Sequence, residues 1–382
     1  MTRRIDIFTG GRADWGLLSV PARALAATPG VAVAVIATGQ HAGAQGTLAA
    51  VQQDFHGPVS LVGMAIADDS GAALSHAMAR LQHGLTDHLA EARPDLLLLL
   101  GDRYEVLTAA TVATMLSIPI AHIAGGDVTE GAMDDALRHA ISKLSHLHFA
   151  TTHEARRRLL AMGEQPDRVV VSGSPGIDRL LGESQIDRHG FFQAIGLEPR
   201  QRNIVVAFHP VTLADNSMDQ LRGMLGALAH LGDEIGIIFT GVNADPGFLS
   251  VDTAIAEFCS GRANAVRRAS LGSHLYANAL RHCDAVVGNS SSGLYEAPTF
   301  RTPTVNIGDR QAGRLRAASV IDCDGAAQAV LGALHAAFAQ DCSGVTNPYG
   351  DGTAGAIIAR HLAGLDDPRR LLRKRFHDSR MA

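Results

Sequence analysis

The 382-residue sequence is poor in several features that mark particular classes of protein. Its four cysteines contain no CxxC pair, which argues against a disulfide framework or a zinc site and predicts buried thiols in a reducing compartment. The formal net charge is −5 without a long run of one sign, so the basic face that nucleic-acid binding requires is missing. No apolar run is long enough to cross a bilayer, and the N-terminus enters a strand without the pattern of a signal peptide. We expect a cytoplasmic protein with neither a nucleic-acid nor a membrane partner.

Hydrophobic residues make up 46% of the chain, enough for the two domain cores that its length suggests. Short apolar runs alternate with helix-length segments up to Asp178 and again from Ile204, which is typical of parallel α/β sheets covered on both faces. A polar stretch over 181–201 reads as the connection. We therefore predict two Rossmann-like α/β domains, over 1–182 and 183–365, and a C-terminal helix over 366–382 that packs its leucines on the protein body.

The most informative stretch runs from Asp95 to His148, where two successive predicted strands end in glycine and aspartate. The first is followed by Gly101 and Asp102, and the second by a loop that contains Asp127 and Glu130, with Asp134 shortly after it. Glycine and aspartate after a strand often form only a turn and a helix cap. Two such loops in a row favour a ligand site, because ligands bind at the carboxyl ends of strands in open parallel sheets.

Glycine-rich turns also follow other predicted strands. Gly10-Gly11 precedes Arg12 and a helix, which places backbone N–H groups and a guanidinium where an anion would bind. Ser290-Ser291-Ser292, between a strand and a helix, is the best candidate for a phosphate site, although it is not a Walker A loop.

Two further side chains have both a functional and a structural interpretation. Glu296 could accept bonds from a ribose or could simply favour the helix dipole. His209, between a strand and a proline, could bind phosphate or act as a general acid, but a lone histidine there is more often structural. Because no HExxH or comparable spacing occurs, we expect no required metal.

Seven motifs in order along about residues 4–320 resemble the hydrolysing UDP-N-acetylglucosamine 2-epimerases of sialic acid synthesis and related bacterial pathways. They are GGRADWGLL from Gly10, GDRYE from Gly101, HIAGGD from His122, DDALRHAISKLSH from Asp134, GSPG from Gly173, HPVT from His209 and GNSSSG from Gly288. The resemblance implies the two-domain GT-B architecture with a sugar nucleotide in the cleft. It also implies that the C-terminal helix returns to the first domain.

The resemblance further implies roles for individual residues. It assigns Asp102 and Asp134 to catalysis and His209 to the phosphates, and the remaining matches to binding of the UDP-sugar: Arg12, Arg103, Asn243, Ser290, Ser291, Glu296 and Arg310. Many members have glutamate where this chain has Ala124, so Asp127 or Glu130 is expected to replace it.

The chemistry implied is removal of the C2 proton by a carboxylate, loss of UDP to give a 2-acetamidoglucal, and addition of water. No cofactor is required, and we expect a homodimer or homotetramer. Within the same chemistry, UDP- or GDP-N,N′-diacetylbacillosamine is an alternative substrate. A GT-B glycosyltransferase and a non-catalytic nucleotide-sugar binder are alternatives from other classes.

Overall fold

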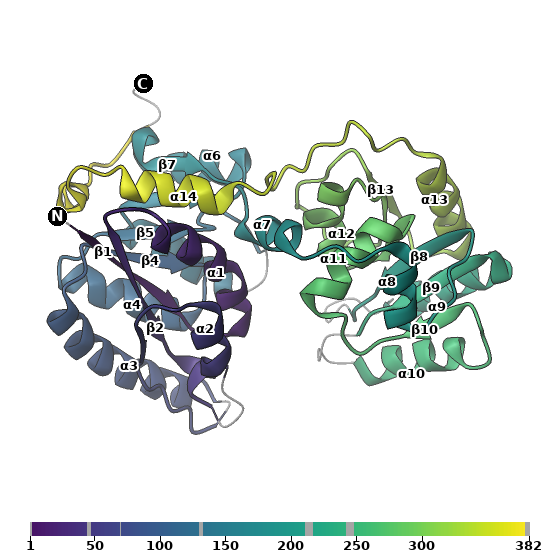
Figure 1. Cartoon of the computed structure of the whole chain (residues 1–382), viewed down its shortest axis with the longest axis horizontal. Coiled ribbons are helices and arrows are strands. Elements are labelled where there is room, and N and C mark those ends of the chain that lie inside the picture. Colours follow the sequence, from purple (N-terminus) through teal and green to yellow (C-terminus); the bar gives the residue numbers. More distant parts are fainter. Residues whose placement is uncertain are drawn as a thin grey trace. The chain divides into compact units, whose positions relative to one another are not determined.

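The computed structural model describes residues 2–43, 47–68, 70–129, 133–210, 217–241 and 248–378. The chain forms two compact units, of which unit 1 contains Met1–Arg179 and Tyr349–Ala382 and unit 2 contains Leu180–Pro348 (Figure 1). Each unit has one parallel sheet with helices between most successive strands, so the prediction of two Rossmann-like α/β domains is confirmed. None of the helices in these described ranges has both the length and the apolar character that a membrane span needs.

Unit 1 is built on a seven-stranded sheet with the order β3-β2-β1-β4-β5-β6-β7. Its strands are β1 (Arg3–Thr9), β2 (Val31–Ala37), β3 (Val59–Leu61), β4 (Leu96–Leu100), β5 (Ile120–Ile123), β6 (Leu147–Ala150) and β7 (Val169–Val171). Its α-helices are α1 (Arg12–Ala26), α2 (Leu48–Asp54), α3 (Gly71–Ala92), α4 (Tyr104–Met115), α5 (Met133–Leu144), α6 (His153–Ala161) and α14 (Ala354–Ala363), and α7 (Pro175–Gly182) crosses into unit 2.

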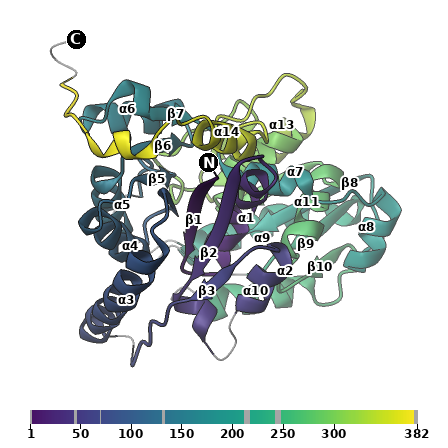
Figure 2. The same cartoon turned by 60° about the vertical axis from the view of Figure 1, so that its left-hand side comes forward.

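The run of five leucines in β4 is buried on both faces of this sheet. Leu96, Leu98 and Leu100 pack in the core that also contains residues of α1 and α14, whereas Leu97 and Leu99 pack in the core with α3 and α4. This division follows from the alternation of side chains along a strand. Figure 2 shows α3, α4 and α5 together on one side of the sheet. The carboxyl end of β4 is therefore fixed by two cores at once.

The C-terminal part of unit 1 differs from the prediction in its start and in its structure. It begins at Tyr349 rather than at 366, and its α-helix is α14, which packs against α1. The Asp178 carboxylate accepts the N–H groups of Ala354 and Gly355 at 3.1 and 2.7 Å, at the start of α14. The helix predicted over 366–382 is wrong for the described residues, since 366–378 contain only a short 3-10 helix, Pro368–Leu372.

Unit 2 has a six-stranded sheet with the order β10-β9-β8-β11-β12-β13. Its strands are β8 (Arg202–Ala207), β9 (Ile235–Phe239), β10 (Ala265–Arg267), β11 (Ala285–Gly288), β12 (Thr304–Ile307) and β13 (Val320–Cys323). Its α-helices are α8 (Arg188–Ile195), α9 (Ser217–His230), α10 (Phe248–Cys259), α11 (Gly272–His282), α12 (Ser292–Tyr295) and α13 (Ala327–Ala339). The stretch 181–201 is thus more than a connection, because α8 buries Phe191 and Phe192 against the sheet.

Candidate active site

The carboxyl ends of β4 and β5 carry the acidic residues that the sequence singles out. Asp102 follows β4 and forms an ion pair with Arg138 of α5. The Arg138 side chain is 8% exposed and that of Asp102 is 23% exposed. Arg138 also donates to Thr129 Oγ1 at 3.0 Å. The ion pair fixes the position of the Asp102 carboxylate at the end of β4, where it stays partly exposed.

The first turn of α5 presents two consecutive aspartates with different surroundings. Asp135 Oδ1 accepts the Thr129 N–H at 2.8 Å and lies 3.7 Å from Arg138 Nη1. Asp135 Oδ2 lies 3.5 Å from His139 Nε2. Asp134, the predicted catalytic residue, is exposed. The helical phase of α5 therefore brings Asp135 into the ionic cluster of Asp102 and Arg138.

A buried histidine links the two strand ends to α5. His122 of β5 donates from Nε2 to the carbonyl of Gly101 at 2.7 Å, and its Nδ1 lies 3.3 Å from Ser142 Oγ. Burial lowers the pKa of His122 to about 3, so the imidazole is neutral at physiological pH. His122 holds the Gly101-Asp102 turn beside α5 and is a structural part of the site.

A second ionic group lies where β1 and β4 end. Arg103, a predicted substrate ligand, donates to both carboxylate oxygens of Glu105 at 2.8 and 3.1 Å. Glu105 is fully buried. Arg103 Nε also lies 3.9 Å from Asp14 in the turn after β1. Sequence reasoning gave no role to Glu105 or Asp14, although both belong to the motifs that it identified.

The carboxyl of Asp14 has a raised pKa. Burial raises the pKa of its carboxyl to about 6, against the opposing charge of Arg103, and Glu105 adds to the rise. Its Oδ2 atom is buried without a hydrogen-bond partner. An acid with these properties can exchange a proton near pH 6. Arg12, two residues earlier, is exposed at the first position of α1.

The loop after β5 is shaped by a non-glycine residue in the left-handed region. Ala124 has φ of +64°, and its N–H donates to the Phe149 carbonyl at 3.0 Å. Asp127 follows and accepts the Thr151 hydroxyl at 2.7 Å, which ties it to the residue after β6. Glu130, the other predicted substitute for the absent glutamate, lies outside the described residues.

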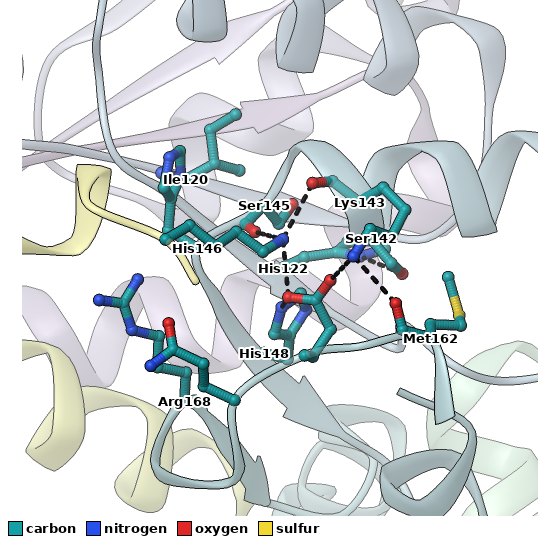
Figure 3. Close-up of polar contacts among 12 residues, drawn as sticks. Ile120, His122, Ser142, Lys143, Ser145, His146, His148, Met162 and Arg168 are labelled. Atoms are coloured by element: carbon teal, nitrogen blue, oxygen red, sulfur yellow. Dashed lines mark hydrogen bonds and ion pairs between the residues drawn. The ribbon is translucent and has the colours of Figure 1, made fainter. Parts of the chain in front are cut away.

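The far end of α5 is held by a cluster of ionisable groups around the buried carboxylate of Glu164. Glu164 accepts from His148 Nε2 at 2.9 Å and from Lys143 and Lys374, each at 2.6 Å. Lys374 also donates to the carbonyls of Lys143 and Ser145 at 2.9 and 2.7 Å. Figure 3 shows Lys143, Ser145 and His148 within this network.

Lys374 connects this cluster to the C-terminal segment of the protein. The residue comes from the C-terminal segment, and its ammonium group binds carbonyls at the C-terminal end of α5, where a positive charge is favourable. The C-terminal segment thereby fixes the helix that carries Asp135 and Arg138.

In unit 2 the predicted phosphate loop follows β11, and its serine side chains form hydrogen bonds with neutral hydroxyl groups. Ser292 Oγ is 2.5 Å from the Tyr276 hydroxyl and donates to Ser290 Oγ at 3.3 Å. The helix behind the serines, α12, has only one turn. A helix this short contributes less dipole than the sequence suggests, so the hydroxyl groups are the main feature of the loop.

The loop is joined to the end of β8 by an asparagine. Asn289 accepts the backbone N–H of His209 and donates to its carbonyl, both at 2.8 Å. Arg310 and Gln311 donate to the Asn289 carbonyl at 3.2 and 2.8 Å. The ends of β8 and β11 and the side chains of Arg310 and Gln311 thus meet at Asn289. Asn289 and Gln311 were not identified from the sequence.

Gly288 is required immediately before this asparagine. Its φ is +131°, and a Cβ atom there would collide with the carbonyl of Ala207 on the neighbouring strand. Beyond the serines, burial raises the pKa of the Glu296 carboxyl to about 7. Asn243, a further predicted ligand, lies outside the described residues.

Comparison with known proteins bears on what such a site does. The family model described as UDP-N-acetylglucosamine 2-epimerase matches residues 23–363. The chain belongs to this family. The resemblance found from the motifs is confirmed, and two of the relatives below bear the names of hydrolysing enzymes.

Three relatives are each 32% identical to the chain. The GDP/UDP-N,N′-diacetylbacillosamine 2-epimerase (hydrolyzing) of Campylobacter jejuni matches over 84% of both chains. The UDP-N,N′-diacetylbacillosamine 2-epimerase (hydrolyzing) of Legionella pneumophila matches over 92% of this chain and 93% of its own length. The polysialic acid biosynthesis protein P7 of Escherichia coli matches over 91% and 90%.

Solved structures of the family share the fold. The UDP-GlcNAc 2-epimerase of Neisseria meningitidis, solved with UDP-GlcNAc, matches with a TM-score of 0.76 and 19% identity over 95% of this chain and all of that chain. The enzyme of Methanocaldococcus jannaschii matches with a TM-score of 0.77 and 18% identity over 94% and 99%. The predicted GT-B type of fold is confirmed.

Proposed function

We propose that the protein is a hydrolysing 2-epimerase that converts UDP-N-acetylglucosamine into UDP and N-acetylmannosamine. The observation that carries the proposal is Asp102, a partly exposed carboxylate that an ion pair with the largely buried Arg138 holds at the end of β4. Removal of the weakly acidic C2 proton needs such a fixed carboxylate. Family membership supports the same chemistry.

The reaction has two steps. Asp102 takes the C2 proton while the bond from C1 to the UDP oxygen breaks, which gives 2-acetamidoglucal and UDP. Water then adds its hydroxyl to C1, and a proton returns to C2 on the opposite face, which gives the free 2-epimer. Asp127, Glu130 and Asp134 are proposed for the proton transfers of the second step, and Asp14 joins them because of its pKa of about 6.

Unit 2 is proposed to hold the nucleotide. Hydrogen bonds from Ser290 and Ser291, together with Arg310 and His209 of the same unit, would meet the negative charge that develops on the departing UDP. Glu296 would accept from the ribose hydroxyls, with Asn243 as a further ligand. Arg12 and Arg103, which belong to unit 1, are also proposed as ligands of the UDP-sugar. Free thiols of all four cysteines agree with a reducing compartment, so we propose a cytoplasmic location.

A second candidate substrate has specific support. Two of the relatives that cover most of the chain carry the name of N,N′-diacetylbacillosamine 2-epimerases. The methyl group of Ala124 in place of a glutamate side chain would also leave more room near the site.

Incubation with each nucleotide sugar, followed by NMR of the products, tests both candidates. Release of UDP and N-acetylmannosamine supports the first, and turnover of the diacetylbacillosamine nucleotide alone supports the second. Epimerisation of an intact UDP-sugar would contradict hydrolysis, and no turnover of either sugar would leave a nucleotide-sugar binder. Light scattering would test the predicted homodimer or homotetramer.

A further inference from the structure

The serine loop of unit 2 ends a chain of hydroxyl groups that begins at a tyrosine of α11. Tyr276 packs on the core that α8 and α11 share, and its hydroxyl lies 2.5 Å from Ser292 Oγ. Ser292 Oγ in turn donates to Ser290 Oγ at 3.3 Å, and the Ser292 N–H approaches the same oxygen at 3.4 Å. The oxygen of Ser290 therefore receives two hydrogen bonds from one neighbour.

The number of hydrogen-bond donors and acceptors on each hydroxyl group fixes the direction in which this chain of hydroxyl groups donates. A serine hydroxyl has one hydrogen to donate and two lone pairs that accept. Both acceptor positions of Ser290 are used by Ser292, so that only its own hydrogen remains. Ser292 uses its single hydrogen on Ser290 and must accept from Tyr276.

The phenol is suited to its place at the start of the chain. Burial raises the pKa of Tyr276, and the charge of nearby Glu296 acts in the same direction, so the hydroxyl keeps its proton. Hydrogen bonds that follow one another in one direction polarise each other. A donor at the end of such a chain is stronger than an isolated serine.

We propose that Tyr276 is a positioning residue that orients Ser292 and Ser290 in one direction, so that Ser290 presents a hydrogen-bond donor to a phosphate oxygen of the nucleotide. This inference rests on the proposed function, because it specifies how the diphosphate is recognised. It also explains selectivity, since Ser290 can then bind only a group that accepts, and a phosphate oxygen is the strongest such group.

Ser291 offers an internal contrast. Its carbonyl accepts from Leu294 and Tyr295, but none of the side-chain hydrogen bonds found in the described part of the chain involves its hydroxyl. The orientation of Ser291 is thus not set by Tyr276. Replacement of Tyr276 should weaken the contribution of Ser290 and leave that of Ser291 intact.

Calorimetric titration with UDP, and NMR titration with uridine, would test the proposal on Tyr276→Phe, Ser290→Ala and the double variant. We expect Tyr276→Phe to weaken UDP about 3- to 10-fold, the usual effect of one hydrogen bond, and to leave uridine unchanged. In the Ser290→Ala background the same replacement should have almost no further effect. In the Ser291→Ala background it should keep its full effect.

Thr302→Val is the matched control. The Thr302 hydroxyl donates to the Leu280 carbonyl of α11 at 2.5 Å and does not belong to the chain of hydroxyl groups. This variant should bind UDP like the native protein. If Tyr276→Phe fails to fold, Ser292→Ala interrupts the chain in the middle and should give the same loss of UDP affinity.

Several results would overturn the proposal. They are native UDP affinity in Tyr276→Phe, an equal loss for uridine and UDP, or a full additional loss in the Ser290→Ala background. Failure of the native protein to bind UDP would overturn both this inference and the proposed nucleotide site. Absence of sugar turnover, with UDP affinities as expected, would overturn the proposed reaction and leave the inference standing.

Discussion

Units 1 and 2 have similar parallel sheets, but the loops after their strands carry opposite kinds of groups. In unit 1 carboxylates face guanidinium groups, as in the pairs of Asp102 with Arg138 and Glu105 with Arg103. In unit 2 the loop after β11 presents hydroxyl and amide groups, with Ser290 and Asn289 at its centre. The loops after the strands thus carry charged groups in unit 1 and neutral hydrogen-bonding groups in unit 2, although the two units have the same type of fold.

The difference follows from what each task requires. A group that moves protons must change charge, and an adjacent cation or burial sets the pH at which it does so. A group that binds a diphosphate must keep its donors in place, and neutral hydrogen-bond donors do this without a titration. We infer that unit 1 performs the proton transfers and that unit 2 binds the nucleotide. Substitutions in each unit should therefore affect different measurements.

The largest expected effect is that of Asp102→Asn. The amide keeps the size of the side chain but cannot accept a proton, so turnover should fall at least about 100-fold, the usual scale for a general base. UDP affinity, measured by calorimetry, should remain near the native value. Equal losses of turnover and UDP affinity would show that the division between the units is wrong. Asp95→Asn, on the residue before β4, controls for the loss of a carboxylate elsewhere in unit 1.

The second effect concerns stability. Lys374→Met leaves the 1% exposed carboxylate of Glu164 without one of its three partners. Breaking a buried ion pair costs about 3–5 kcal/mol. Because Lys374 is 19% exposed, we expect about 2–4 kcal/mol of lost unfolding free energy. Arg370→Met, at an exposed arginine nearby, should change stability little.

The pH dependence of this loss has a definite sign. Burial alone would raise the pKa of Glu164, but its bonds from His148, Lys143 and Lys374 lower it to about 2. A carboxylate with a lowered pKa stabilises the protein above its unfolded pKa, near 4.5, and this contribution disappears as the pH falls towards 2. Urea unfolding should show the Lys374→Met deficit at pH 7 and a smaller one below pH 4. A deficit independent of pH would indicate lost packing alone.

A smaller effect is expected in unit 2. Replacing both Ser290 and Ser291 by alanine should weaken UDP by about 1–3 kcal/mol, because hydrogen bonds to charged groups are of this order. Calorimetry on the folded variant gives the change in binding free energy, with Ser260→Ala, at an exposed serine after α10, as a control. Unchanged affinity would remove the serines from phosphate binding.

The smallest effect is a change in a pH profile. Because the pKa of Asp14 is raised from 3.8 to about 6, the cost of ionising it in the folded protein grows between these pH values and is complete above pH 6. Asp14→Asn should therefore be more stable than the native protein at pH 8 by about 1–3 kcal/mol. At pH 4 the two should be equal. If Asp14 also transfers protons, the change of kcat/KM with pH near pH 6 should be absent in Asp14→Asn. A change near pH 6 that persists in this variant would show that another group causes it.

The same comparison separates what the sequence could predict from what it could not. Strand alternation and glycine turns located Asp102 and the serine loop, because both signals are local. The partners are distant in sequence: Arg138 lies 36 residues from Asp102, and Lys374 lies 210 residues from Glu164. Asp135 joins this cluster because it lies three residues before Arg138 on the same helix, whereas the catalytic role of Asp134 stays a prediction from the family motif.

Unit 2 has the same limit. The chain of hydroxyl groups joins Tyr276 to Ser292 from two different helices, and a half-buried tyrosine in a helix has no local mark of its role. The sequence also did not predict that α12 has a single turn and is followed closely by a 3-10 helix, Ala297–Phe300.

Turnover in D2O, followed by NMR of the released sugar, tests the central claim most directly. If a carboxylate of unit 1 removes the C2 proton and solvent returns it, each molecule of N-acetylmannosamine should carry deuterium at C2, while UDP is released. Product without deuterium at C2 would contradict proton abstraction by any of the proposed acids, and with it the assignment of the chemistry to unit 1.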